Sequence, residues 1–271
     1  MKILKVTREN ALFQEIGALS QNRSKRRQAG SIFVEGVMSI DRAVASGLKV
    51  KSLIYSEGRA LSSWASGLIK KFPASEVVEM SAELFARISE KQEPSELIML
   101  AAFPESRLCD IVPLQGSPAV VIDRPSSCGN LGSIIRSCDA FGASGVVVTG
   151  HAVDIYDPKT IRSSMGSIFS LPVAFAEAGA LFEWLGSLRR TAANFQVIGT
   201  SAKAEKFVSE VDFSRPTAIL IGNETEGLSR RLKEASDSLV KIDIRGSATS
   251  LNVACAATVF LYQSSLSPVR K

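Results

Sequence analysis

The sequence has little of what many enzymes use for acid–base, covalent or metal chemistry. It holds a single histidine, His151, and four cysteines that lie far apart without any C-x-x-C pair. A histidine-based mechanism therefore has one candidate and no evident triad, and neither a zinc cage nor a disulfide framework is expected. We predict that the cysteines are buried thiols and that the protein holds no metal.

Long apolar runs are missing as well. No stretch approaches the roughly eighteen apolar residues of a membrane span, and the opening residues MKILKVTREN do not develop the apolar core of a signal peptide. We therefore expect a cytoplasmic protein without membrane contact. The P-loop and the G-x-G-x-x-G fingerprint are also absent, which argues against a nucleotide hydrolase and a dinucleotide-dependent dehydrogenase.

The positive charge of the sequence is concentrated near its N-terminal end. Residues 1–30 contain seven Lys or Arg against two Glu, and so account for the whole formal charge of +5. The densest part is a cluster formed by Arg23, Lys25, Arg26 and Arg27. Such a cluster is either a handle for the phosphate backbone of RNA or a solvated turn, and charge alone does not decide between them.

A chain of 271 residues is long for one compact core and predicts two domains. An irregular stretch at residues 103–118 places the boundary near residue 112, which gives domains at 1–112 and 113–271. The first domain alternates strands and helices, as an α/β domain does. Its strands are predicted at residues 31–35, 50–55, 76–80 and 97–103, and its helices at 39–46, 61–71 and 82–89.

The second domain alternates more plainly. Its strand-like runs are apolar on both faces, which predicts a parallel sheet covered by helices. These runs lie at residues 119–123, 145–149, 195–200, 217–222 and 239–244. The helices are predicted at 130–141, 158–168, 178–191, 228–236 and 251–264. Ligands of such sheets bind beyond the carboxyl ends of the strands, so the loops there are where chemistry is expected.

Three loop segments are unusual. The first, residues 125–136, opens a helix for which Asn130 is the expected N-cap. Arg136 falls almost opposite the apolar stripe of that helix, where its guanidinium suits a phosphate or ribose oxygen, although it is also read as a solvated surface arginine.

The second segment, residues 221–229, has a glycine at each end that lets the backbone approach a ligand such as a nucleoside cofactor. The third, residues 246–254, starts a helix that is apolar nearly all round and is therefore expected to be buried, either within the chain or against a partner subunit. Thr249 or Ser250 is the expected N-cap of this helix, which leaves Asn252 without an explanation.

Taken together and in this order, the three segments resemble the signature of the SpoU (TrmH) branch of the SPOUT RNA methyltransferases, over nearly all of residues 118–263. Residues 157–173 look like the family's linker between its first and second motifs. Residues 24–36 and the helix and strand after them are similar to the small substrate-binding domain of many relatives. The resemblance implies an α/β fold, with a C-terminal SPOUT-type parallel-sheet domain that contains a deep trefoil knot, preceded by a small α/β RNA-binding domain. Residues 125–128 depart from the family pattern, which more often has an Asp-Pro pair.

The resemblance also implies a cofactor, S-adenosylmethionine, held in a bent form largely by backbone groups of three loops. The residues that match the family's functional positions are Asn130, Arg136, Glu224, Ser250 and Asn252. Those expected to bind the cofactor are Thr200, Ser201, Gly222, Asn223, Glu224, Ile242, Ser250 and Leu251. Those expected to contact RNA are Arg23, Lys25, Arg26, Arg27 and Arg136. Family members are homodimers through the knotted region, which suits the apolar last helix.

The implied reaction is transfer of a methyl group to a ribose 2′-hydroxyl of RNA. The N-terminal domain points to large-subunit ribosomal RNA, because the transfer-RNA guanosine enzymes of this branch look shorter and lack it. A guanidinium is a poor base, so we expect Arg136 to orient the phosphate or ribose and to stabilise developing negative charge. The alternatives are a catalytically silent RNA-binding or ribosome-assembly protein, a transfer-RNA ribose methyltransferase, and a base methyltransferase of a related branch. An antibiotic-resistance enzyme would be a narrower form of the main hypothesis.

Overall fold

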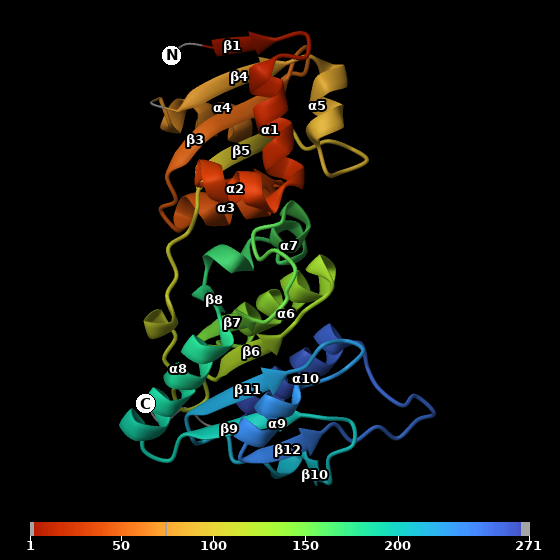
Figure 1. Cartoon of the computed structure of the whole chain (residues 1–271). Coiled ribbons are helices and arrows are strands. Elements are labelled where there is room, and N and C mark those ends of the chain that lie inside the picture. The colour runs from red at the N-terminus through yellow and green to blue at the C-terminus, as the bar shows by residue number, and fades with distance from the viewer. Residues whose placement is uncertain (1–2, 74, 267–271) are drawn as a thin grey trace. The chain divides into compact units, whose positions relative to one another are not determined.

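The structure, a computed structural model, describes residues 3–73 and 75–266 and divides into two compact units (Figure 1). The first unit consists of Met1–Glu105 together with Tyr156–Phe169, and the second of Ser106–Ile155 together with Ser170–Lys271. This division differs from the expected boundary at residue 112 in two ways. It falls a few residues earlier, and it assigns an internal segment of the expected second domain to the first unit.

The first unit is built on a five-stranded mixed sheet in the order β1-β4-β3-β5-β2. The strands are β1 (Ile3–Val6), β2 (Ser31–Glu35), β3 (Val50–Ser56), β4 (Glu76–Met80) and β5 (Leu97–Ala102). The helices are α1 (Ala11–Gln21), α2 (Arg23–Ala29), α3 (Val37–Ala45), α4 (Ser63–Lys71) and α5 (Ala82–Ile88). β5 runs antiparallel to its neighbours β2 and β3, whereas β4 runs parallel to β1 and β3. The predicted strands and helices are confirmed within a few residues, and β1, α1 and α2 are additions.

The basic cluster is a helix and not a turn. Asn22 caps α2 through its side-chain oxygen, which accepts from the backbone N–H of Lys25 at 3.1 Å. The helix ends at Gly30, whose φ of 55° is left-handed and favours glycine. Within the helix, Arg26 is only 1% exposed, so one of the four cations belongs to the interior of the first unit.

The segment 156–169 packs into the first unit, although its sequence lies between two strands of the second. It contains α7 (Pro158–Ser163) and a short 3-10 helix, Ser167–Phe169. The single helix expected at 158–168 is interrupted because the backbone turns left-handed at Met165 and Gly166. A Cβ at Gly166 would lie 2.9 Å from the Cα of Ser39, so glycine lets this segment lie close to α3.

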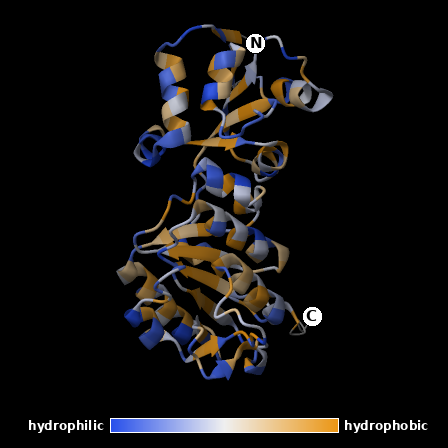
Figure 2. Ribbon diagram, turned by 90° about the vertical axis from the view of Figure 1, so that its right-hand side faces the viewer, coloured by the Kyte–Doolittle hydropathy of each residue, from blue (hydrophilic) through white to orange (hydrophobic). Residues whose placement is uncertain are grey.

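The second unit holds a seven-stranded sheet in the order β10-β12-β9-β11-β6-β7-β8, and every pair in it is parallel. The strands are β6 (Ala119–Asp123), β7 (Gly145–Thr149), β8 (Val173–Ala176), β9 (Gln196–Thr200), β10 (Lys206–Phe207), β11 (Thr217–Ile221) and β12 (Ser238–Lys241). The helices are α6 (Cys128–Ala140), α8 (Ala178–Thr191), α9 (Arg230–Ala235) and α10 (Val253–Ser265). The predicted parallel sheet is confirmed, and Figure 2 shows the hydrophobic character of its strands. β8 and β10 are additions.

Two helix starts differ from prediction. α6 begins earlier than expected, because Ser127 is its N-cap and accepts from the backbone N–H of Asn130 at 3.3 Å. α10 begins later, because its N-cap is Asn252, whose side-chain oxygen accepts from the N–H of Ala254 at 2.9 Å. Asn130 is therefore not an N-cap, whereas Asn252 is one, and both residues were predicted to be functional. Across residues 3–73 and 75–266, no helix has the length and apolar character that crossing a membrane requires.

Candidate active site

A cavity of about 720 Å³ opens at the carboxyl end of the second unit's sheet. Because β9, β11 and β12 are parallel neighbours, the loops that follow them meet at this edge and form the cavity wall. The residues predicted to bind the cofactor all line it: Thr200, Ser201, Gly222, Asn223, Glu224, Ile242, Ser250 and Leu251. The loops after β9, β11 and β12, which hold these residues, are thus brought around one space, whereas residues 125–136, the first of the three segments singled out in the sequence, do not line it.

The loop after β11 is a tight turn held by its own backbone. The N–H of Asn223 donates to the carbonyl of Gly227 at 3.1 Å, and the N–H of Gly227 donates back at 3.0 Å. A Cβ at Gly222 would lie 2.3 Å from the carbonyl carbon of Gly227. Only glycine fits where the two arms of the turn approach so closely, so the turn presents Glu224 from a fixed base.

Three of the predicted polar residues form one hydrogen-bonded chain. The side-chain amide of Asn130, on α6, donates to Glu224 Oε1 at 3.1 Å. The amide of Asn252, at the start of α10, donates to the side-chain oxygen of Asn130 at 3.2 Å. Asn252 therefore both caps α10 and extends the chain of hydrogen bonds. These two roles explain Asn252, for which the predicted N-caps Thr249 and Ser250 gave no role.

Glu224 has a further partner that sequence reasoning missed. Its Oε2 accepts from both the backbone N–H and the hydroxyl of Ser126, at 3.1 and 2.7 Å. Partial burial by itself would raise the pKa of Glu224, but the hydrogen bonds from Asn130 and Ser126 outweigh it and hold the pKa below its ordinary value. The carboxylate is therefore kept ionised beside the cavity, where a cationic ligand group would be stabilised.

Arg136 lies apart from this chain. It is exposed on α6, and within residues 3–73 and 75–266 the structure shows no hydrogen bond or ion pair made by its guanidinium. Ser250 is exposed and lines the cavity. A single copy of the chain thus joins Asn130, Glu224 and Asn252, places Ser250 on the same cavity, and leaves Arg136 free.

Asp123 and Arg124 support the turn that presents Glu224 without lining the cavity, and the sequence did not single them out. Asp123 ends β6 and is 3% exposed, and the guanidinium of Arg124 pairs with it at 3.2 Å. An acid at the end of a parallel strand is a signal that sequence reasoning could have used. The conformation of Arg124, with a left-handed φ of 52°, has no such signal.

The cations predicted to contact RNA are divided by their burial. Lys25 and Arg27 are exposed, Arg23 is half-buried and Arg26 is buried, so Arg26 is withdrawn from that set.

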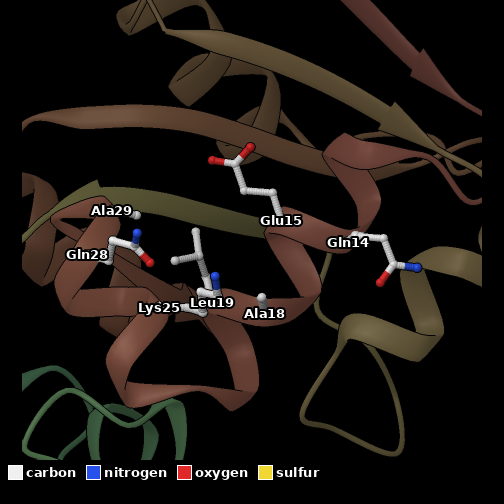
Figure 3. Close-up of a pocket in the computed structure, with 7 residues that line it drawn as sticks. All are labelled: Gln14, Glu15, Ala18, Leu19, Lys25, Gln28 and Ala29. Atoms are coloured by element: carbon white, nitrogen blue, oxygen red, sulfur yellow. The ribbon is translucent and has the colours of Figure 1, made fainter.

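A hollow of about 470 Å³ lies between α1 and α2 (Figure 3). It is lined by Gln14, Glu15, Ala18, Leu19, Lys25, Gln28 and Ala29.

The cysteines show one correction. Cys138 is buried in α6, Cys128 is half-buried, and Cys109 and Cys255 are exposed, so the expectation of buried thiols holds only for Cys138. Among the described residues, no group of three or more His, Cys, Asp and Glu side chains is arranged to hold a metal ion.

Comparison with known proteins agrees with this geometry. Residues 117–262 match the SpoU rRNA Methylase family, and residues 10–99 match the SpoU L30e-like domain. The chain is 42% identical over 96% of its length to a 23S rRNA (uridine(2479)-2′-O)-methyltransferase of Streptomyces viridochromogenes, of which it covers 91%. The chain is 27% identical to the 23S rRNA (guanosine(2553)-2′-O)-methyltransferase RlmP of Bacillus subtilis, with 89% of this chain and 90% of that protein covered.

Solved structures give the same result. The SpoU methyltransferase AviRb from Streptomyces viridochromogenes, in complex with the cofactor AdoMet, superposes with a TM-score of 0.89 at 42% identity over 95% of this chain and 97% of that chain. An AdoMet-bound rRNA methyltransferase from Sinorhizobium meliloti superposes with a TM-score of 0.85 at 31% identity over 97% of both chains. The chain belongs to the SpoU rRNA methylase family, and the resemblance predicted from the three loop segments is confirmed.

Proposed function

We propose that this chain transfers a methyl group from S-adenosylmethionine to a ribose 2′-hydroxyl of 23S ribosomal RNA. The observation that carries the proposal is the cavity formed by the loops after β9, β11 and β12, with the chain Glu224–Asn130–Asn252 beside it. The relatives named as 23S rRNA 2′-O-methyltransferases support the same reaction and the same class of RNA.

The cavity fits an adenosyl cofactor. Its volume of about 720 Å³ lies in the range of about 300–1,000 Å³ that is typical of small-molecule sites. The close approach of Gly227 requires glycine at position 222, and the turn that these glycines close lines the cavity. When bound, the cofactor supplies an electrophilic methyl group on a sulfonium. The ionised Glu224 offers this cation a negative neighbour, held in place by Asn130 and Ser126.

Arg136 is proposed to act on the RNA and not on the cofactor. Its guanidinium stays charged and cannot serve as a base, but its fork of donors suits a phosphate or a developing alkoxide. Since Arg136 is exposed and unpaired in one copy of the described chain, we propose that it completes the site of a second copy in a homodimer.

The outer face of α10 supports such a homodimer. Leu251, Tyr262 and Leu266 are 41%, 53% and 56% exposed, and they lie along or next to a helix that contacts α6. A dimer formed through this helix would cover such exposed apolar side chains. We expect sedimentation to give twice the mass of the 29.0 kDa chain, and Tyr262→Glu to shift it toward the monomer. The deep trefoil knot and the cytoplasmic location stay predictions.

The exposed cations of α2 are proposed to bind the RNA backbone. Lys25 and Arg27 are exposed on α2, and Lys25 also lines the hollow in Figure 3. Contacts of this kind weaken with salt, with a slope that falls by about one for each phosphate contact removed. Lys25→Gln and Arg27→Gln are therefore expected to raise the apparent Kd for rRNA without changing cofactor affinity.

The proposed function is tested by mapping 2′-O-methyl groups in ribosomal RNA from cells with and without the gene. We expect one ribose position of 23S rRNA to lose its methyl group. Digestion of RNA labelled in vitro, followed by identification of the nucleoside, separates ribose from base methylation. Calorimetry that shows cofactor binding, together with no methylated RNA of any class, would indicate the catalytically silent alternative. Label found in transfer RNA would contradict the ribosomal assignment.

Arg136→Ala separates binding from transfer. We expect this variant to keep cofactor affinity, because no described cofactor-loop residue forms a hydrogen bond or an ion pair with Arg136, and to lose methyl transfer. Near-normal turnover would remove Arg136 from the mechanism.

A further inference from the structure

Two of the site's loops are joined by one arginine. Arg124 follows β6, and its guanidinium bonds to both sides. On its own side, Nε and NH2 donate to the two carboxylate oxygens of Asp123, each at 3.2 Å. On the other side, NH1 pairs with Glu226 and NH2 donates to the carbonyl of Gly227 at 3.1 Å. The side chain thus spans from the end of β6 to the turn after β11.

The backbone of Arg124 adds a second connection between the same loops. Its carbonyl accepts from the side-chain amide of Asn223 at 2.7 Å, and its own N–H donates to the carbonyl of Thr149 at 2.9 Å. The left-handed φ of 52° is unfavourable for a residue with a Cβ. Such a conformation persists only where the surroundings fix it, as these bonds do.

The packing around Arg124 is equally specific. A Cβ at Gly150 would lie 2.6 Å from the Cγ of Arg124, so the aliphatic stem lies against bare backbone. Asp123, which is 3% exposed, also accepts from the backbone N–H of Ser229 at 2.8 Å. This buried carboxylate thus accepts from three donors, two of them on Arg124.

The turn that Arg124 holds is the one that presents Glu224. Residues 223 and 227 close the turn, Glu226 is the anchor, and Glu224 points from the same turn to Ser126 and Asn130. Ser126 and Asn130 belong to the loop and helix that Arg124 itself begins. Each hydrogen bond from Ser126 or Asn130 to Glu224 therefore joins the segment after β6 to the turn after β11. Arg124 connects the same two segments.

We propose that Arg124 is a positioning residue of the methyl-transfer site: by fastening the turn at residues 223–227 to the end of β6, it fixes the Glu224 carboxylate against Ser126 and Asn130. The proposal deepens the proposed function and rests on it for its catalytic consequence. Arg124 itself does not line the cavity, so it acts through Glu224.

The test follows the Glu224 carboxyl carbon by NMR titration of the full-length protein, with Glu224→Gln to assign the signal. The charged side chains of the two joined loops are Asp123, Arg124 and Glu226, and Lys203, Lys233, Lys241 and Asp243 line the same cavity as Glu224. In the wild type, the carboxyl group should titrate below the ordinary value for glutamate of about 4.3. Arg124→Met keeps the apolar stem but removes the fork, and we expect the titration to move up toward the ordinary value.

Arg124→Lys separates position from charge. A lysine keeps the positive charge but cannot bridge Asp123, Glu226 and a carbonyl with one planar fork. We expect it to give most of the shift that Arg124→Met gives. A titration like that of the wild type would show that charge alone acts on Glu224, and would overturn the positioning role.

Glu226→Ala is a milder variant, which keeps the test informative if Arg124→Met does not fold. The side chain of Glu226 is 67% exposed, and its removal leaves Asp123 and Arg124 paired. We expect a smaller upward shift of the Glu224 titration. Arg230→Met, which removes an exposed arginine paired with Glu234, is the matched control and should leave the titration unchanged. No shift in both Glu226→Ala and Arg124→Met would contradict the proposal.

Turnover then distinguishes this inference from the function on which it rests. With 23S rRNA as substrate, we expect kcat to fall roughly 10- to 100-fold in Arg124→Met, the size of effect that small misplacements produce. A shifted titration with no methyl transfer even in the wild type would refute the proposed function and leave the positioning role intact. Normal titration and normal kcat in Arg124→Met would refute the positioning role alone.

Discussion

Replacing the buried arginine of α2 should destabilise the first unit strongly. Arg26 is 1% exposed, and its NH1 donates to the carbonyls of Leu19 and Ser20 at 2.9 and 3.1 Å. Its NH2 pairs with Asp157 at 3.4 Å. Methionine keeps most of the stem's length but removes every donor, so Arg26→Met isolates the polar contribution.

The magnitude follows from the acceptors that are left behind. The two carbonyls lie in the last turn of α1, where helix carbonyls have no partner within the helix. A buried acceptor left without a donor costs about 1–3 kcal/mol. With two such carbonyls and a half-exposed Asp157, we expect the free energy of unfolding to fall by about 2–5 kcal/mol. This is a large part of the roughly 5–15 kcal/mol that is typical of a domain.

The measurement needs a signal from the first unit alone. The chain has two tryptophans, Trp64 in the first unit and Trp184 in the second. In a Trp184→Phe background, urea unfolding followed by fluorescence reports on Trp64. Lys25→Met on the same helix is exposed and serves as the control, with an expected change within about 0.5 kcal/mol. A loss in Arg26→Met no larger than in that control would refute the reasoning.

Four further outcomes are expected. Gly222→Ala should abolish cofactor binding and lower stability, because its Cβ would lie 2.3 Å from backbone. Gly179→Ala, which meets nothing within 4 Å in α8, should instead raise the unfolding free energy by roughly 0.5–1 kcal/mol, and the reverse order in thermal denaturation would contradict the packing. The depressed pKa of Glu224 means that its ionised form stabilises the fold above the unfolded-state pKa and that this stability is lost as pH falls through the lower folded-state value. Glu224→Gln should therefore flatten the acid side of the stability profile, and an unchanged profile would argue against it. Burial raises the pKa of the Cys138 thiol, so Cys138 should resist alkylation at neutral pH while the exposed Cys109 reacts, as mass spectrometry of the native protein would show.

Much of the second unit could be predicted from the sequence because its strands are apolar on both faces. The runs at residues 119–123 and 145–149 match β6 and β7 residue for residue. Parallel strands then fix the edge of the sheet at which loops meet, whereas the three loops of the cavity were predicted from the family resemblance. Helix starts were harder to predict, because Ser127 and Asn130 are both good N-caps and the helix begins after Ser127.

Other features depend on contacts that a linear pattern does not carry. Four neighbouring cations look alike in the sequence, and burial of Arg26 depends on the end of α1 and on Asp157, 131 residues further along the chain. The left-handed Arg124 is set by Asn223, almost one hundred residues away. Arg136 is exposed, and no pattern in the sequence says what its guanidinium contacts.

The segment 156–169 has a consequence for how the protein is made. Pro158, Ile161 and Phe169 are buried in a unit whose other residues end at Glu105. A ribosome that adds roughly 5–20 residues per second needs about 3–13 s to extend the nascent chain from residue 105 to residue 169. During that interval the emerging first unit lacks α7 and the acid that neutralises Arg26. The first unit can therefore finish folding only after β6 and β7 have been translated. Until then, chaperones would bind a first unit that lacks residues 156–169.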